Sequence, residues 1–216
     1  MVKKTNLCNP INYGGLRAGP VKYIVIHYTA GDGDTDEANA AYFARADTGK
    51  TSAHWFVDDD SATLSVPEDR VAYHCGASYY YHPECRNSNS IGVEMSSVRR
   101  NGRYCFTEAT IANAQALVRE LMAKYQVPPE RVIRHYDVTH KICPAPFCGA
   151  GQAAWEEFKG GLIMYQKIEN VPSWAKDTVQ KLMDKDYLLG DGEGNLNLSG
   201  DMVRILVILD RAGVFD

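Results

Sequence analysis

The sequence predicts an α/β protein with a mixed central β-sheet flanked by helices, followed by a small helical C-terminal module. Three observations lead to this prediction. The apolar run at residues 22–28 lacks polar–apolar alternation, as is typical of a strand buried on both faces. Residues 108–126 keep one apolar face at helical spacing. Predicted strands and helices then alternate through residues 20–160, as they do in α/β domains.

The N-terminal third contains several short predicted elements. Residues 1–20 are polar, with two prolines and three glycines, and predict an irregular segment. Asp34, with Glu37 three residues later, is typical of a helix start, so a helix is expected at residues 35–47. Further strands are expected at residues 53–58, 62–66 and 71–74, the first two joined as an antiparallel pair.

The middle of the chain gives the clearest signals. Residues 90–95 predict another strand, and Thr107 is expected to cap the helix at residues 108–126, which Pro128 and Pro129 end. Residues 132–135 predict the next strand, and residues 153–159 predict the last helix of this domain.

The predicted domain organisation is a main domain at residues 1–160, a linker at 161–171 and a small helical module at 172–216. In the module, Ser173 is expected to cap a helix at residues 174–185, and Asp201 is expected to start one at 201–212. So short a pair cannot bury its apolar faces alone. We therefore expect it to dock on the main domain or on a second copy of the chain, which makes a homodimer one alternative.

Composition limits the classes of function. The 216 residues carry a net charge of −4, which does not indicate a nucleic-acid partner. No run of about 20 apolar residues predicts a membrane span. No apolar segment follows Lys3 and Lys4, so we expect no secretory signal and synthesis in the cytoplasm. In that compartment the six cysteines are expected to be reduced thiols.

One stretch carries residues typical of metal chemistry. His135 and Cys143 are eight residues apart, and Lys141 lies two residues before the cysteine. Imidazole and thiolate are ligands that zinc prefers, and three protein ligands with one open position make a catalytic site. His27, near the end of the strand at residues 22–28, is the best candidate for the third ligand. Each histidine alone is more often an ordinary hydrogen-bonded residue, but Glu94 also lies at a predicted strand end, where catalytic groups of α/β enzymes gather.

Four motifs in order resemble a known family. Ile24-Val25-Ile26-His27-Tyr28-Thr29, Ser52–Asp58, Asn89–Glu94 and Arg134–Pro144 are similar to segments of the type 2 N-acetylmuramoyl-L-alanine amidases. That family includes phage endolysins and is related to animal peptidoglycan recognition proteins. The resemblance covers roughly residues 20–160.

The resemblance implies roles for particular residues. It makes His27, His135 and Cys143 the ligands of one Zn²⁺, Glu94 the general base and Lys141 the cation that faces the scissile carbonyl.

Three further residues are candidates for substrate binding. His54 and His74 match recurrent histidines of the family, which we interpret as lining the groove or as structural. Tyr80 belongs to the aromatic loop at residues 78–82. Its side chains suit stacking on sugar rings, and they suit internal packing of a long loop equally well. Some phage relatives have a catalytic tyrosine where this chain has Ala53.

The implied function is cleavage of the amide between N-acetylmuramic acid and L-alanine in peptidoglycan. The resemblance is to wall-lytic enzymes of phage, prophage or host, so we expect an endolysin or autolysin that reaches the wall after holin-type release or lysis. The main alternative is a peptidoglycan-binding protein without activity, although such relatives usually lack the cysteine that stands here at position 143. A zinc deaminase would need an H-x-E…P-C-x-x-C pattern, which the chain lacks.

Overall fold

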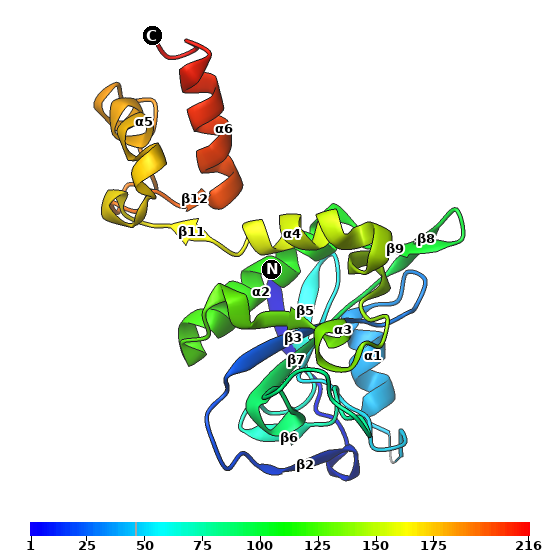
Figure 1. Cartoon of the computed structure of the whole chain (residues 1–216). Coiled ribbons are helices and arrows are strands. Elements are labelled where there is room, and N and C mark those ends of the chain that lie inside the picture. Colours follow the sequence, from blue (N-terminus) through cyan, green and yellow to red (C-terminus); the bar gives the residue numbers. More distant parts are fainter. Residues whose placement is uncertain (46) are drawn as a thin grey trace. The chain divides into compact units, whose positions relative to one another are not determined.

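The computed structural model describes residues 1–45 and 47–216. These residues form two compact units, residues 1–155 and residues 156–216 (Figure 1). Among the described helices, none is long and apolar enough to cross a membrane.

The first unit is built on a mixed β-sheet, which confirms the predicted fold class. In the described part of the chain this sheet has six strands in the order β1-β5-β4-β7-β3-β10. Every neighbouring pair is parallel except β4 and β5, which are antiparallel. The strands are β1 Val2–Thr5, β3 Tyr23–Tyr28, β4 Trp55–Val57, β5 Ser61–Leu64, β7 Ser90–Met95 and β10 Val132–Arg134. Two small antiparallel pairs lie outside it, β2 Tyr13–Leu16 with β6 Arg70–Ala72, and β8 Val98–Arg100 with β9 Arg103–Cys105.

The centre of the sheet is the pair of parallel strands β3 and β7. Ile24 and Ile26 of β3 and Ile91 and Val93 of β7 are fully buried. Because successive side chains of a strand point to opposite faces, these four residues share one face of the sheet. The other face of the same two strands therefore carries the polar residues that form the site described below.

Helices cover this sheet (Figure 1). On one side, Ala40 and Phe43 of α1 pack against Phe56 of β4. The long helix α2 contacts β3, β4, β5 and β7, and Thr107 caps it as predicted, because its side chain accepts from the backbone N–H of Thr110. The helices of this unit are α1 Asp36–Phe43, α2 Glu108–Tyr125 and α3 His135–Thr139, and α4 Gln152–Gly160 spans the boundary between the units.

Several predicted elements differ from the structure. Residues 1–20 are not irregular throughout, because they contain β1 and β2; β1 is a mostly exposed edge strand whose place depends on pairing with β5 rather than on its own pattern. Helix α1 is shorter than predicted, and position 46 of the predicted range lies outside the described residues. Its cap is Thr35 rather than Asp34, whose carboxylate instead accepts from Thr29 and Asn39. The hairpin of β8 and β9 was not predicted.

The second unit consists of two helices and a small antiparallel strand pair. Helices α5 Ser173–Asp184 and α6 Gly200–Arg211 pack around buried residues of the unit together with β11 Met164–Tyr165 and β12 Leu198–Ser199. The expected linker at residues 161–171 is part of this unit, because β11 lies within it and pairs with β12. Ser173 is the first residue of α5 and does not cap it. Helix α6 starts at Gly200, one residue before the predicted start at Asp201, and Ser199 caps it.

The second unit has its own core and its own ion pairs. Lys181 of α5 lies 2.9 Å from Asp210 of α6, and Thr178 donates a hydrogen bond of 2.6 Å to the same carboxylate. The predicted helical pair therefore buries a shared interface within this unit. An apolar strip of α6 stays exposed, with Ile205 at 56% and Ile208 at 64% of their full accessible surface.

Candidate metal centre

His27 and Glu94 come together because β3 and β7 are parallel and in register. The two residues are direct partners across the strand pair, so their side chains leave the same face of the sheet. Nδ1 of His27 lies 3.9 Å from Oε1 of Glu94. His27 is 2% exposed, which confirms that it lies at the buried end of a central strand.

His135 and Cys143 come from the segment that follows β10. His135 is the first residue of α3 rather than the end of a strand, because Asp137 accepts from the backbone N–H of Arg134 and turns the chain into the helix. The loop after α3 then returns, and the backbone N–H of Tyr136 donates to the carbonyl of Cys143 at 2.8 Å. This bond holds the cysteine beside the start of α3.

The three predicted ligands converge. The ligand atoms of His27, His135 and Cys143 all lie within 4.8 Å of one another, and all three residues are buried. Sγ of Cys143 is 3.6 Å from Nδ1 of His27, and the two imidazole centroids are 4.7 Å apart. Among the described residues, no other group of three His, Cys, Asp or Glu side chains has this geometry.

Protonation of these side chains suits metal binding. Burial, with the charges of His135 and His74, holds the pKa of His27 well below its usual range. Burial and the charge of Lys141 lower the pKa of His135 to about 4. Both imidazoles are therefore neutral at pH 7, as metal ligands must be. Burial and the charge of Glu94 raise the pKa of Cys143 to about 12, so a thiolate here needs a cation beside it.

An unpaired atom also indicates that the site fits a metal ion. Within residues 1–45 and 47–216, buried Nδ1 of His135 has no hydrogen-bond partner. An unpaired buried nitrogen is costly, and most such groups in proteins have a partner. Two neutral imidazoles, one of them with this unpaired nitrogen, and a thiol form a donor set that suits one soft or borderline metal ion.

Glu94 and Lys141 lie at the same site. Burial raises the pKa of Glu94 to about 8, with a smaller contribution from Asp34 in the same direction, whereas Lys141 opposes the rise. Oε2 of Glu94 is buried without a hydrogen-bond partner in the described part of the chain. A carboxyl group whose pKa is raised by burial and which faces a cavity is typical of a functional site rather than of a surface ion pair.

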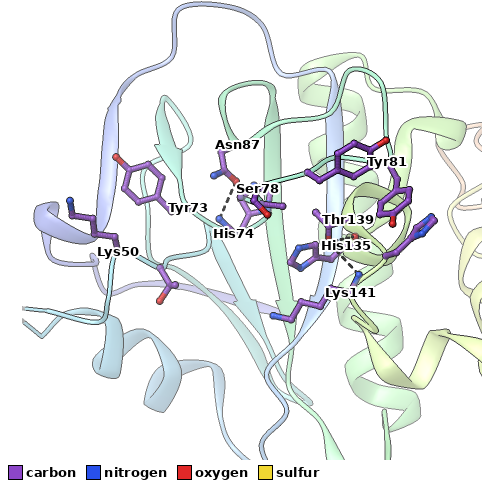
Figure 2. A pocket seen from close by; sticks show the side chains of 14 residues that line it. Lys50, Tyr73, His74, Ser78, Tyr81, Asn87, His135, Thr139 and Lys141 are labelled. Carbon is purple, nitrogen blue, oxygen red and sulfur yellow. Dashed lines mark hydrogen bonds between the residues drawn. The ribbon is translucent and has the colours of Figure 1, made fainter.

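Two cavities meet at this centre. One, of about 420 Å³, is lined by His27, Glu94 and Cys143 together with Tyr42 and Phe43 of α1. The other, of about 640 Å³, is lined by the loop at residues 76–81 and by the segment around α3 (Figure 2). The lining residues that the two cavities share are Thr51, Tyr73, His74, His135 and Lys141.

Of the three expected substrate-binding residues, one lines the cavities and two do not. His74 lines both cavities, the larger of which is drawn in Figure 2. His54 lines neither of the two, is fully buried, and accepts a 2.9 Å hydrogen bond from the backbone N–H of Gly92, which is a structural position. Tyr80 also lines neither, because its ring packs under the guanidinium of Arg86 at 3.9 Å.

Aromatic residues that the sequence did not single out take the place expected for Tyr80. Its neighbours Tyr79 and Tyr81 line the larger cavity, as does Tyr73. The ring of Tyr81 stacks on His140, with centroids 3.6 Å apart and planes 14° from parallel. The run of three tyrosines signalled an aromatic surface, but the side that each ring faces depends on how the loop folds.

Fold and site together define the class of this protein: an α/β protein with a buried His–His–Cys centre that suits one metal ion. Residues 17–146 match the family model described as N-acetylmuramoyl-L-alanine amidase (Amidase_2). The chain therefore belongs to the type 2 N-acetylmuramoyl-L-alanine amidase family, as the four motifs predicted.

Individual relatives agree with this assignment. The chain is 38% identical over 157 residues to the N-acetylmuramoyl-L-alanine amidase CwlL of Bacillus licheniformis, covering 68% of this chain and 42% of that protein. It is 39% identical over 208 residues to a probable N-acetylmuramoyl-L-alanine amidase of the same species, covering 92% of this chain and 55% of the relative. It therefore spans about half the length of these curated relatives.

Among solved structures, the catalytic domain of XlyA is similar with a TM-score of 0.62 and 28% identity. The match covers 76% of this chain and all of that domain. A mutant of PlyL is similar to the same degree, with a TM-score of 0.62 and 27% identity over 75% of this chain and 98% of PlyL.

Proposed function

We propose that this chain is a zinc-dependent peptidoglycan hydrolase that cleaves the amide bond between N-acetylmuramic acid and L-alanine. The observation that carries the proposal is the buried triad of His27, His135 and Cys143 with Glu94 and Lys141 beside it, at the meeting point of two cavities. Family membership supports the choice of substrate, and the His₂Cys donor set supports the choice of zinc.

His27, His135 and Cys143 would hold the metal. When bound there, zinc supplies a Lewis acid and lowers the pKa of water toward 7. The side chains of the chain itself provide the remaining parts of the reaction, which are proton transfer, charge stabilisation and substrate binding.

In this proposal Glu94 carries the proton. Its carboxylate takes a proton from the attacking water as the new C–O bond forms, and it delivers that proton to the nitrogen as the C–N bond breaks. Burial raises the pKa of this carboxyl to about 8, which supports a role in which one group both accepts and releases a proton.

In the same proposal Lys141 stabilises negative charge. It lines both cavities and is an exposed cation, so its ammonium can approach the carbonyl oxygen of a bound amide as charge develops there. Tyr79 and Tyr81, on the wall of the larger cavity, offer aromatic surface to the sugar or the stem peptide.

The cellular role follows from the same proposal. Hydrolysis of this amide separates stem peptides from glycan strands, so the enzyme would act on the cell wall as an endolysin or autolysin, after release from the cytoplasm. The exposed apolar strip of α6 favours a role of the second unit in wall binding or dimerisation.

Digestion of purified cell walls tests the proposed reaction. Chromatography with mass spectrometry should show free stem peptides that begin with L-alanine and glycan strands that keep their lactyl groups. A chelator should stop the reaction, and added zinc should restore it. If the protein sedimented with the walls but released no peptide, it would be the peptidoglycan-binding protein considered as the alternative.

A further inference from the structure

We infer that His74 and Ser90 are positioning residues that fix the tautomer of His27, so that Nδ1 of His27 is the nitrogen presented to the metal. The inference rests on the metal site proposed above and goes beyond it, because it concerns two residues that would not touch the ion. It follows from a chain of hydrogen bonds whose direction is set at one end.

The face of the sheet that carries His27 is built to hold the imidazole of His74. Ser90, Gly92 and Glu94 alternate along β7, so they point to the same face as His27. Gly92 leaves the space that His74 fills, since a Cβ at position 92 would lie 2.5 Å from Cγ of that ring.

The backbone beneath His74 is also held in place. The side-chain oxygen of Asn87 accepts a hydrogen bond of 3.2 Å from the backbone N–H of His74 (Figure 2). It accepts a second one, of 2.8 Å, from the backbone N–H of Cys75. Ring and backbone are thus both fixed, so the two ring nitrogens of His74 have defined partners.

A backbone carbonyl at one end sets the donor-to-acceptor direction of these hydrogen bonds. The hydroxyl of Ser90 lies 2.7 Å from the backbone carbonyl of Arg86, which can only accept, so Ser90 donates its one proton there. Nε2 of His74 lies 3.1 Å from the same hydroxyl and must therefore donate its N–H to it. With its proton on Nε2, His74 has a bare Nδ1, which accepts the Nε2–H of His27 at 3.0 Å.

This arrangement leaves the lone pair of Nδ1 of His27 free on the side of the metal centre. That nitrogen faces Sγ of Cys143 at 3.6 Å and Oε1 of Glu94 at 3.9 Å. The opposite tautomer would place an N–H there, which cannot bind a metal. A partner on the remote nitrogen is what sets the tautomer of a ligating histidine.

The sharpest test compares His74→Leu with His74→Asn. Leucine and asparagine have nearly the same shape, but the asparagine oxygen can take the place of Nδ1 as acceptor, whereas leucine offers none. Zinc affinity of the full chain is measured by competition with a chromogenic chelator. We expect His74→Leu to weaken zinc binding by about 10- to 100-fold, the typical effect of removing such a partner, and His74→Asn to retain most of the affinity. Ser90→Ala should weaken binding in the same direction.

Nuclear magnetic resonance of the metal-free, unsubstituted chain tests the tautomer without any variant. Two-bond ¹H–¹⁵N correlation spectra distinguish an imidazole protonated at Nε2 from one protonated at Nδ1. We expect both His27 and His74 in the Nε2–H form, and we expect His27 to become a mixture of forms in His74→Leu.

The outcomes separate this inference from the proposed function. If His27 carried its proton on Nδ1, or if His74→Leu and His74→Asn bound zinc equally well, the positioning role would be refuted while the zinc site stood. If the unsubstituted chain bound no zinc, the proposed function would fail, and the spectra of the metal-free chain would still decide the tautomer.

Discussion

Removal of zinc should destabilise one unit of this protein and leave the other unchanged. All three proposed ligands lie in the first unit, on β3, at the start of α3 and in the loop after it, so the ion would join segments far apart in the sequence. The second unit has its own buried core and contributes no ligand. It therefore serves as an internal control within the same molecule.

The size of the effect follows from mass action. Free zinc at about 1,000 times its dissociation constant stabilises the folded state by about 4 kcal/mol. In a unit of this size each kcal/mol shifts the melting temperature by about 2–4 °C, so the expected loss on chelation is about 8–16 °C. Differential scanning calorimetry of the full chain with zinc and with chelator measures it, because the two units should melt as separate transitions.

Two cysteines provide matched variants for this experiment. Cys143→Ala removes a ligand and should abolish the difference between zinc and chelator. Cys148→Ala removes a thiol five residues later that is not part of the triad, and it should keep the full difference. The reasoning would be refuted if chelator shifted both transitions equally, or if Cys143→Ala kept the zinc-dependent shift.

Three further predictions follow from the site and from the second unit. Glu94→Gln and Lys141→Ala should each lower the rate of muropeptide hydrolysis by about 10²–10³-fold, with zinc content unchanged by elemental analysis; near-normal rates would assign proton transfer and charge stabilisation to other groups. The double variant Ile205→Gln/Ile208→Gln should either weaken sedimentation with intact walls or shift the solution mass from dimer to monomer. Hydrolysis of a small soluble muropeptide should stay the same. If both wall sedimentation and solution mass were unchanged, the exposed strip of α6 would serve neither wall binding nor dimerisation. Asp191→Ala should destabilise the second unit at neutral pH, because hydrogen bonds from Asn195 and Glu193 lower the pKa of Asp191 to about 2. A lowered pKa stabilises the folded state fully above the pKa of the unfolded chain, and this stabilisation is lost as pH falls through the pKa of the folded state. The difference in stability between Asp191→Ala and the unsubstituted chain should therefore narrow as pH falls from about 4 to about 2. A difference in melting temperature that stayed constant over this range would contradict the prediction.

The sequence alone determined the elements whose signals are local. The apolar run of β3 and the apolar face of α2 each follow from side chains a few residues apart, so their periodicity was sufficient. The triad could also be predicted, because His27, His135 and Cys143 lie within motifs that together resemble one family, although each histidine alone would not have been sufficient.

Only the tertiary structure decided features that depend on partners distant in the chain. Strand β1 is polar and mostly exposed, and it is a strand because β5 offers an edge to pair with. Tyr79 and Tyr81 rather than Tyr80 line the cavity, because the fold of a loop decides which way each ring points.

The link from Ser90 through His74 to His27 is of the same kind. Its residues are 16 and 47 positions apart in sequence. Parallel pairing of β3 and β7 brings His27 and Ser90 to one face of the sheet, and His74, in the segment after β6, contacts both of them there. Gly92 gives no sign in the sequence that it makes room for an imidazole. Sequence specifies which groups are available for chemistry, and three-dimensional packing decides which atoms of those groups face one another.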